Sequence, residues 1–581
     1  MKNGRDFMIV TNNPLVEKVL SKYYEVRYLP EENYRAILIT VRDLVYAGHK
    51  LYTHPLSGSV KPNETPYKSV VVSKVPHKMN ADEAAIISNC VEAYDKFTPR
   101  NRMLSDKVLG DFQLIDYTLL CGAVDYDAAA GLSKLDNQIY PCKKKKEEVF
   151  DLKLELGFIE IKDIQFSNES KVENGTLFVN ADDVKAFVYE DDDVKACVKS
   201  VCFDIAKPGE SVRITPVKDV IEPRVKVEGP GGEFPGVIAK VDTVGSGKTH
   251  VLRGMAVVTA GPIVGFQEGI IDMTGPGAEY TPFSKLLNLV MVCTQVEGVH
   301  QHEYEHAVRI AGLRAATFIG ELGRNVTPDE TKEFETLGIR EGLEKYPNLP
   351  RVGYVHMLQS QGLLHDTYVY GVDAKRTLTT IIYPTETMDG AIISGNCVSA
   401  CDKNTTYHHQ NNPVVADLFE QHGKTLNYVC NIITNENVYL ADKQRSSDWS
   451  AKLCRLLDLD GVIVSQEGFG NPDTDLIMNT KKIEQVGVKT TIITDEYAGQ
   501  DGKSQSLADA DPLADAVVTG GNANMVIELP KLDKVIGTLD YVDKIAGGHA
   551  GSLRPDGSIE AELQVITGAT NEMGFNCLSA R

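Results

Sequence analysis

From Asn427 onward the chain alternates regularly between short apolar runs and longer amphipathic stretches. The apolar runs at 428–434, 461–465 and 488–494 have the length and β-branched composition of buried strands, and the stretches between them have helical periodicity. Strands that alternate with helices predict a parallel, doubly wound sheet. This pattern constrains the fold of the chain more than any other feature does.

Acidic residues follow the predicted strands of this sheet. Glu467 comes after the second strand, and Asp495 and Glu496 come after the third. Ligands of doubly wound sheets bind outside the carboxyl ends of the strands, so these carboxylates would suit a small substrate that carries an ammonium group. Helix N-caps are the alternative interpretation of the same residues.

The rest of the chain predicts other architectures. Polar and apolar residues alternate from Phe158 to about Thr259, which predicts an antiparallel β-rich region. Helices are expected at His300–Glu321 and Pro328–Tyr346, and a strand at Arg351–Met357. The predicted fold class is therefore α/β and α+β multidomain, with a small N-terminal α/β domain, a β-rich middle domain and a C-terminal doubly wound parallel sheet.

Charge and composition exclude several functions. The 581 residues carry a formal net charge of -21, so the long-range field repels nucleic acid and anionic lipid. The first residues lack the apolar core of a secretory signal, and no apolar run has the length of a membrane span. The 11 cysteines include no C-x-x-C pair, so we expect reduced thiols rather than a disulfide framework. We expect a cytoplasmic protein with no nucleic-acid or membrane partner.

Motifs that suggest nucleotide or metal binding are incomplete. The segment Val244–Thr249 resembles the end of a phosphate-binding loop, but a strand follows it where a helix should begin. His302 and His306 lie four apart on a predicted helix, but no third metal ligand can be placed. Cys397 and Cys401 lack a second ligand pair at zinc-site spacing. We therefore predict neither a nucleotide cofactor nor a metal.

The dipeptide Asn396-Cys397 lies between an apolar run and a polar loop, and it is a candidate for cleavage of its own backbone. A thiol next to its preceding carbonyl can convert the amide into a thioester. Loss of the Cys397 α-proton would then release a thiocarboxylate and leave dehydroalanine, which hydrolyses to a pyruvoyl group. Cyclisation of the Asn396 side chain would cut the same bond and leave an ordinary cysteine. The third alternative is a buried free cysteine in an uncut chain.

Long motifs identify a family. From about Leu152 to its end, the chain closely resembles the precursor of the α and β subunits of component B of the glycine/sarcosine/betaine reductase complex. The resemblance includes the motifs VRITPVKDVIEPRVKVEGPG, GFQEGIIDMTGPGAEYTPFSK, QGLLHDTYVYGVDAKR, MDGAIISGNCVSACDKN, TNENVYLADKQRSS and TDEYAGQDGKSQSLADAD. It implies cleavage between Asn396 and Cys397, with Cys397 as the precursor of a covalent pyruvoyl group.

The resemblance also implies a domain organisation. Residues 1–135 resemble the small accessory X protein that is encoded beside these subunits, on the strength of Leu44–Val70, and its role is open. A charged linker is expected at 136–151, where four lysines precede two glutamates. The N-terminal subunit region would then be 152–396, and the C-terminal subunit region 397–581.

The family reaction is reductive cleavage of the C–N bond of a small amino-acid substrate: glycine, sarcosine or betaine. The resemblance implies that the pyruvoyl ketone forms a Schiff base with the substrate amine and so activates the substrate. The quaternary nitrogen of betaine cannot form one. The chain has no selenocysteine, so the implied nucleophile belongs to a selenoprotein subunit of component B. The further implied partners are a second selenoprotein and an acetyl-phosphate-forming component.

Residues around the predicted cut would orient the scissile carbonyl or transfer protons. These candidates are Ser394, Asp402, Lys403, Thr405 and His408. We favour His408 as the base, because the ordinary pKa of histidine lies near neutrality.

Other functional classes remain open at this point. A proline-reductase-like subunit or a decarboxylating pyruvoyl enzyme would share the prosthetic group, and the released product, amine or carbon dioxide, distinguishes them. A noncatalytic scaffold of the complex would keep its activity after Cys397→Ala.

Overall fold

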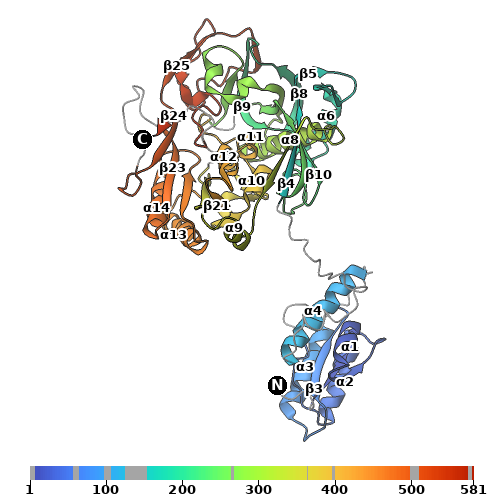
Figure 1. Ribbon diagram of the computed structural model, residues 1–581. Helices are drawn as coiled ribbons and strands as arrows, with labels where there is room; N and C mark the ends of the chain where they lie inside the picture. Colours follow the sequence, from blue (N-terminus) through green and yellow to red (C-terminus); the bar gives the residue numbers. More distant parts are fainter. Residues whose placement is uncertain are drawn as a thin grey trace. The chain divides into compact units, whose positions relative to one another are not determined.

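The computed structural model describes residues 7–56, 65–96, 106–124, 153–262, 267–362, 364–395, 399–496, 509–573 and 579–580. The chain divides into two compact units, Met1–Glu148 and Val149–Arg581, and each is described by itself (Figure 1). Among the helices in the described ranges, none combines the length and apolar character that a bilayer crossing requires.

The smaller unit is a three-stranded sheet with helices on both faces. Strand β1 (Phe7–Thr11) is central, parallel to β2 (Glu25–Tyr28) and antiparallel to β3 (Ser69–Ser73). Successive residues of β1 point to opposite faces, so Met8 and Val10 pack with α2 and α3, while Phe7 and Ile9 pack with α1 and α4. Its helices in the described ranges are α1 (Pro14–Leu20), α2 (Tyr34–Tyr46), α3 (Ala81–Asp95) and α4 (Asp106–Val124). The prediction of a small α/β domain is confirmed, although β3 was not predicted.

Two mixed sheets form the first half of the larger unit. One has the strand order β10-β11-β4-β15 and the other β13-β9-β12-β14-β8, with β26 beside β9. Their strands are β4 (Lys153–Glu160), β8 (Val198–Ala206), β9 (Val212–Ile221), β10 (Arg224–Glu228), β11 (Gly247–Arg253), β12 (Met255–Ala260), β13 (Gly269–Asp272), β14 (Leu287–Gln295), β15 (Glu330–Glu335) and β26 (Lys534–Gly537). The region is β-rich as predicted, but β11 with β4 and β12 with β14 run parallel. The alternation in the sequence carries no information on which distant strand will be the partner.

The expected helix at Pro328–Tyr346 is wrong in its first half. Residues Glu330–Glu335 form β15, which pairs antiparallel with β4, and only Ile339–Lys345 forms a helix, α9. Lys332 and Glu333 are exposed, so this charged run fits the edge of a sheet. Helix α8 (Gln301–Glu321), in contrast, confirms the helix expected at His300–Glu321.

A seven-stranded sheet dominates the second half of the larger unit. Its order is β19-β21-β16-β22-β23-β24-β28, parallel except for the two edge strands. The strands are β16 (Arg351–Leu358), β19 (Thr380–Ile382), β21 (Asn427–Asn435), β22 (Gly461–Ser465), β23 (Lys489–Glu496), β24 (Val517–Asn522) and β28 (Ser579–Ala580). Helices α13 (Leu440–Leu456) and α14 (Asn471–Gln485) pack on one face, and α12 (Pro413–Gln421) with β4 and β11 on the other. The predicted parallel sheet is confirmed.

The seven-stranded sheet contains residues from both sides of the predicted cleavage pair. Strand β16, which precedes the pair, lies between β21 and β22, which follow it. Strand β26, which also follows the pair, is added to β9 of the mixed sheet. The regions 152–396 and 397–581 are therefore interleaved rather than separate.

The chain passes from β16 to β21 on one side and then returns to β22 on the other side, so the strand order reverses at β16. Such a switch point is where doubly wound sheets bind their ligands. Short elements complete the larger unit: β5 (Asp163–Phe166), β6 (Lys171–Glu173), β7 (Thr176–Val179), α6 (Ala181–Val188), α7 (Asp192–Cys197), β17 (Tyr368–Val369), β18 (Val372–Asp373), α10 (Pro384–Met388), β20 (Ile392–Ile393), α11 (Thr406–Gln410), β25 (Val526–Leu529) and β27 (Ile559–Glu562). Short 3-10 helices in the part of the chain that the structure describes lie at Pro276–Tyr280, Pro282–Lys285, Ala374–Arg376 and Leu563–Val565.

Candidate functional site

The predicted cleavage pair, Asn396 and Cys397, lies outside the described residues. The described chain stops at Gly395, just after β20, and resumes at Ser399 before α11. All the predicted supporting residues are in these flanks and are almost completely buried: Ser394, Asp402, Lys403, Thr405 and His408. Polar loops ordinarily lie on the protein surface, so the burial of these polar flanking residues is unusual.

In the upstream flank, the backbone N–H and the carbonyl oxygen of Ser394 both form hydrogen bonds. The N–H of Ser394 donates to Thr406 Oγ1 at 3.1 Å, and Arg309 Nη1 donates to the Ser394 carbonyl oxygen. Thr406 is anchored in turn, since its hydroxyl and its N–H donate to the two carboxylate oxygens of Asp219 at 2.6 and 2.9 Å. A Cβ on Gly395 would lie 2.4 Å from the carbonyl carbon of Asp366, so only glycine fits there.

A small cavity of about 10 Å³ adjoins Gly395, and its lining includes the charged side chains of Lys218, Asp219, Glu305 and Arg309. This volume is about that of one water molecule. Arg309 pairs with Glu305, and Lys218 pairs with Glu268 at 2.8 Å. The cavity is therefore polar, and its charges are mostly paired.

Lys403 extends from the downstream flank toward the same region. Its ammonium group donates to the backbone oxygen of Lys218. Burial lowers the pKa of Lys403, and the nearby carboxylate of Asp219 opposes that shift. Lys403 thus ties the downstream flank to strand β9, which carries Lys218 and Asp219. The same strand supports the upstream flank through Asp219 and Thr406.

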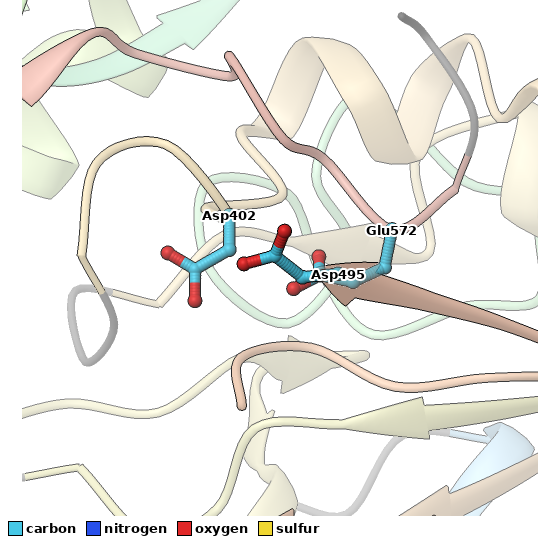
Figure 2. Close-up of side chains that lie close together, drawn as sticks. All are labelled: Asp402, Asp495 and Glu572. Carbon is cyan, nitrogen blue, oxygen red and sulfur yellow. The ribbon is translucent and has the colours of Figure 1, made fainter. Parts of the chain in front are cut away.

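Three buried carboxyl groups gather on the downstream side, and we call Asp402, Asp495 and Glu572 the acidic cluster. One carboxylate oxygen from each residue lies within 4.8 Å of the other two. Figure 2 shows Asp402 on the loop after the predicted cut, Asp495 at the end of β23 and Glu572 on a separate C-terminal segment. The fold therefore brings together groups that are far apart in the sequence.

Burial controls the protonation of the acidic cluster. It raises the pKa of Asp402 to about 6, although the Ser399 hydroxyl, which donates to Asp402 at 2.6 Å, opposes the shift. Burial and the charges of Asp402 and Asp495 raise the pKa of Glu572 as well. Among the described residues no cationic side chain forms an ion pair with Asp402 or Glu572, and Glu572 Oε2 accepts no hydrogen bond. Near neutral pH such a cluster must hold protons or accept a cation.

Carboxylate oxygens are also the ligands that Mg²⁺ and Ca²⁺ prefer, and the acidic cluster has the spacing for such an ion. The sequence predicted no metal, and that expectation stays a prediction.

Glu467, one of the predicted substrate-binding residues, lies at the switch point. It follows β22, and its Oε2 accepts hydrogen bonds from Gln359 N at 2.9 Å and Thr367 Oγ1 at 2.7 Å. Its Oε1 lies 3.8 Å from Nε2 of the buried His409. Asp495 belongs to the acidic cluster, while the side chain of Glu496 lies outside the described part of the chain.

The sequence favours His408 as the base because the ordinary pKa of histidine lies near neutrality, but the fold moves the pKa of this histidine away from that value. Burial, together with the neighbouring His409, lowers the pKa of His408 to about 3. The imidazole is therefore neutral, and its Nδ1 accepts the backbone N–H of Thr405 at 3.1 Å as part of the cap of α11. Thr405 and His408 define where this helix begins. Their role in cleavage stays a prediction.

Sequence reasoning missed Arg309, Asp219 and Glu572. Arg309 had a detectable signal, because it and Glu305 are a charged pair at i and i+4 inside the apolar face of α8. Asp219 lies in the completely buried strand β9, and Glu572 in a segment with no regular periodicity. Neither showed a pattern that links it to residues 396 and 397.

Two known protein families match different parts of the chain. The family described as glycine/sarcosine/betaine reductase component B subunits matches residues 152–581, and the GrdX-like proteins match residues 8–125. No solved structure matches the chain.

Individual relatives carry related names. The chain is 68% identical over 432 residues to the glycine reductase complex component B subunits alpha and beta of Peptoclostridium acidaminophilum. This match covers 74% of the present chain and 100% of the relative. It is 57% identical over 430 residues to the sarcosine reductase complex component B subunit alpha of the same organism, with the same coverage. The D-proline reductase proprotein PrdA of Acetoanaerobium sticklandii is 23% identical over 363 residues, 58% of this chain and 53% of that protein. The chain therefore belongs, through residues 152–581, to the family of glycine/sarcosine/betaine reductase component B subunits, and it carries a GrdX-like domain before them.

Proposed function

We propose that this chain is the precursor of the component B subunits of a glycine reductase complex, and so acts as an oxidoreductase on a C–N bond. The choice of glycine is supported by the higher identity to the glycine reductase relative, 68%, than to the sarcosine reductase relative, 57%. The names of both relatives describe parts of a multicomponent complex. The partner that attacks the substrate would be a selenoprotein, since this chain has no selenocysteine.

The precursor cuts itself between Asn396 and Cys397. The Cys397 thiol adds to the Asn396 carbonyl carbon, and the peptide nitrogen leaves that carbon and takes up a proton, which gives a thioester. Loss of the Cys397 α-proton then breaks the Cβ–S bond, so the thiocarboxylate leaves with Asn396 and dehydroalanine remains. Water converts this group into a pyruvoyl ketone and releases ammonia. The name proprotein on the D-proline reductase relative supports processing of this kind.

The observation that carries the proposal is the burial and anchoring of both flanks of the cleavage pair. Arg309 and Thr406 hold the backbone of Ser394, and Lys403 is tied to β9. A backbone held in this way meets the neighbouring thiol in one geometry, which accelerates an intramolecular attack.

The chemistry of the residues that follow the cleavage pair suits an electrophilic group at position 397. When present, the pyruvoyl ketone supplies an electrophile for the substrate amine. Asp402 has a pKa of about 6, so it exchanges protons close to neutral pH, as a general acid or base should. Glu572 Oε2, buried and without a hydrogen-bond partner among the described residues, is an acceptor for a cationic amine.

The test is denaturing electrophoresis and intact mass measurement of the purified full chain. We expect two fragments that separate at residues 396 and 397, with the 397–581 fragment lighter than its sequence because it has lost sulfur and nitrogen, and reactive with phenylhydrazine. Cys397→Ala should leave one uncut chain with no reactive carbonyl. Cys202→Ala is the matched control, since Cys202 is an exposed free thiol.

Three results would contradict the proposal. An uncut wild-type chain would exclude self-cleavage, and a 397–581 fragment with an intact N-terminal cysteine would indicate cyclisation of Asn396 instead. Full activity of the assembled complex with Cys397→Ala would make the chain a scaffold.

A further inference from the structure

Two buried histidines near the switch point of the seven-stranded sheet have ring nitrogens without hydrogen-bond partners. His356 lies on β16 and His409 on α11, both side chains are completely buried, and their ring centres are 5.5 Å apart. Among the described residues, none forms a hydrogen bond with Nδ1 or Nε2 of either ring. A neutral imidazole carries one donor and one acceptor, and buried polar groups are nearly always hydrogen-bonded. These nitrogens therefore indicate a partner that the polypeptide does not supply.

The carboxylate of Glu467 extends toward His409. Its Oε2 accepts hydrogen bonds from the backbone N–H of Gln359 and the hydroxyl of Thr367, which fix the direction of the group. Its Oε1 lies 3.8 Å from His409 Nε2, which is beyond hydrogen-bond distance. An ammonium nitrogen that is about 2.8 Å from each of two atoms can bridge a gap of this size. Glu467 and His409 thus offer two acceptors to one donor group.

No lysine or arginine in the described part of the chain balances the charge of Glu467. The ion-pair contact of its carboxylate is with His409, and its own backbone N–H donates to the buried Glu436 at 2.6 Å. Glu572, the acceptor for the amine in the proposed function, accepts the N–H of Gly468 at 3.1 Å and so lies beside the same segment. Buried carboxyl groups without a cation favour a ligand that brings a positive charge.

An ammonium group fits these side chains better than a metal ion does. In the described ranges, the acidic cluster meets the spacing of ligand atoms around one ion, and the atoms of His356, His409 and Glu467 do not. Hydrogen bonds from an ammonium nitrogen are about 2.8 Å long, whereas bonds from histidine or carboxylate to zinc are about 2.1 Å. An ammonium group therefore reaches acceptors that are further apart.

We propose that Glu467 and His409, with His356 beside them, bind the amine of the substrate through its N–H groups. The inference rests on the proposed function, which supplies a small amino acid as the substrate. The ammonium group donates to Glu467 Oε1 and to a ring nitrogen of His409. Transfer of one proton from the ammonium nitrogen to His409 leaves the neutral amine that addition to a ketone requires. Glycine and sarcosine fit this site, and betaine, whose nitrogen carries no hydrogen, does not.

The test is calorimetric titration of the full Cys397→Ala chain, which cannot form a ketone, with glycine, betaine and acetate. We expect saturable binding of glycine. Betaine and acetate should bind at least about tenfold more weakly, because neither offers an N–H donor to the two acceptors. Binding through these side chains is thereby measured apart from any bond to a ketone.

Two variants of the Cys397→Ala chain test the assignment. His409→Phe keeps the shape of the ring and removes no hydrogen bond within the described residues, so it should fold as well as its parent. Glu467→Gln keeps an oxygen for Gln359 and Thr367 but presents an NH2 group to the ligand. Each should weaken glycine binding at least about tenfold. His549→Phe is the control, since His549 is exposed, and it should bind glycine like its parent.

Three outcomes overturn the inference, with circular dichroism as the check of folding. They are no glycine binding by the folded Cys397→Ala chain, binding of betaine or acetate as tight as that of glycine, and unchanged glycine affinity in both folded variants. Cleavage of the wild-type chain is scored separately by mass. Normal cleavage without glycine binding rejects this inference alone, whereas glycine binding by a chain that is never cut rejects self-cleavage and keeps the amine site.

Discussion

Arg309 Nη1 donates a hydrogen bond to the backbone carbonyl oxygen of Ser394, 85 residues further along the chain. The guanidinium is buried, and it also pairs with Glu305, one turn earlier in α8. A helix of the middle region thus holds the strand that leads into the predicted cleavage pair.

Replacing Arg309 should slow cleavage. In Arg309→Met the Ser394 carbonyl loses its donor and the buried Glu305 keeps His365 as an ion-pair partner, so we expect uncut precursor to accumulate and stability to fall by about 1–3 kcal/mol. The cut fraction is measured over time by denaturing electrophoresis, with circular dichroism as the check of folding.

The control is Arg314→Met, on the same helix, where the guanidinium binds the backbone oxygen of Phe187 and has no contact with Ser394. Arg309→Lys keeps the charge but not the planar fork, so it should fold better than Arg309→Met and still cleave slowly. Normal cleavage by a folded Arg309→Met would exclude a role for this contact.

Gly395→Ala should disturb the same peptide from the other side. The added Cβ would lie 2.4 Å from the carbonyl carbon of Asp366 and 2.6 Å from the N of Thr367, so the backbone must shift. We expect slower cleavage and a loss of about 1–3 kcal/mol in stability. Gly461→Ala is the matched variant, since its Cβ would meet no atom closer than 3.5 Å, and it should behave like wild type.

Stability should depend on pH through Asp402. Its folded pKa of about 6 lies above the unfolded value of about 3.9, so ionisation penalises the folded state progressively as pH rises through this interval. Asp402→Asn removes the penalty, and we expect a gain of about 2–3 kcal/mol at pH 7.5 that disappears near pH 4.

Thermal unfolding of both proteins across this pH range measures the effect. Asp417→Asn, at an exposed site, should show no such pH-dependent difference. A constant difference between Asp402→Asn and wild type at every pH would show that Asp402 does not titrate in this interval.

The two fragments should remain together after cleavage. Strand β16 lies between β21 and β22, and β26 is bonded to β9, so each fragment completes a sheet of the other. Size-exclusion chromatography without denaturant should give one peak that contains both fragments, and guanidinium should separate them. Two peaks under native conditions would contradict the interleaved fold.

Local patterns predicted the elements well where those patterns were strong. The run at 461–465 is β22 at the same residues, and the run at 428–434 is β21 with one residue more at each end. The pairing of β16 into this sheet was not predicted, because strand order depends on contacts between distant segments.

The site was predicted only in its local part. Cys397 and its neighbours showed a chemical signal in the sequence, and the structure places Ser394 and Asp402 in the buried flanks of that pair. Arg309 and Glu572 reach these flanks through tertiary packing, which short-range periodicity does not record. The raised pKa of Asp402 and the lowered pKa of His408 are consequences of burial, so they too required the fold.

Glu572 comes from the last segment of the chain, yet it completes the surroundings of Asp402. A ribosome-bound polypeptide cannot build these surroundings until it has been extended to residue 572 and that segment can fold. In the proposed reaction, maturation therefore waits for the segment that carries Glu572, and molecules that end before it would keep their peptide bond intact. The appearance of the new chain ends would report that this segment has joined the fold.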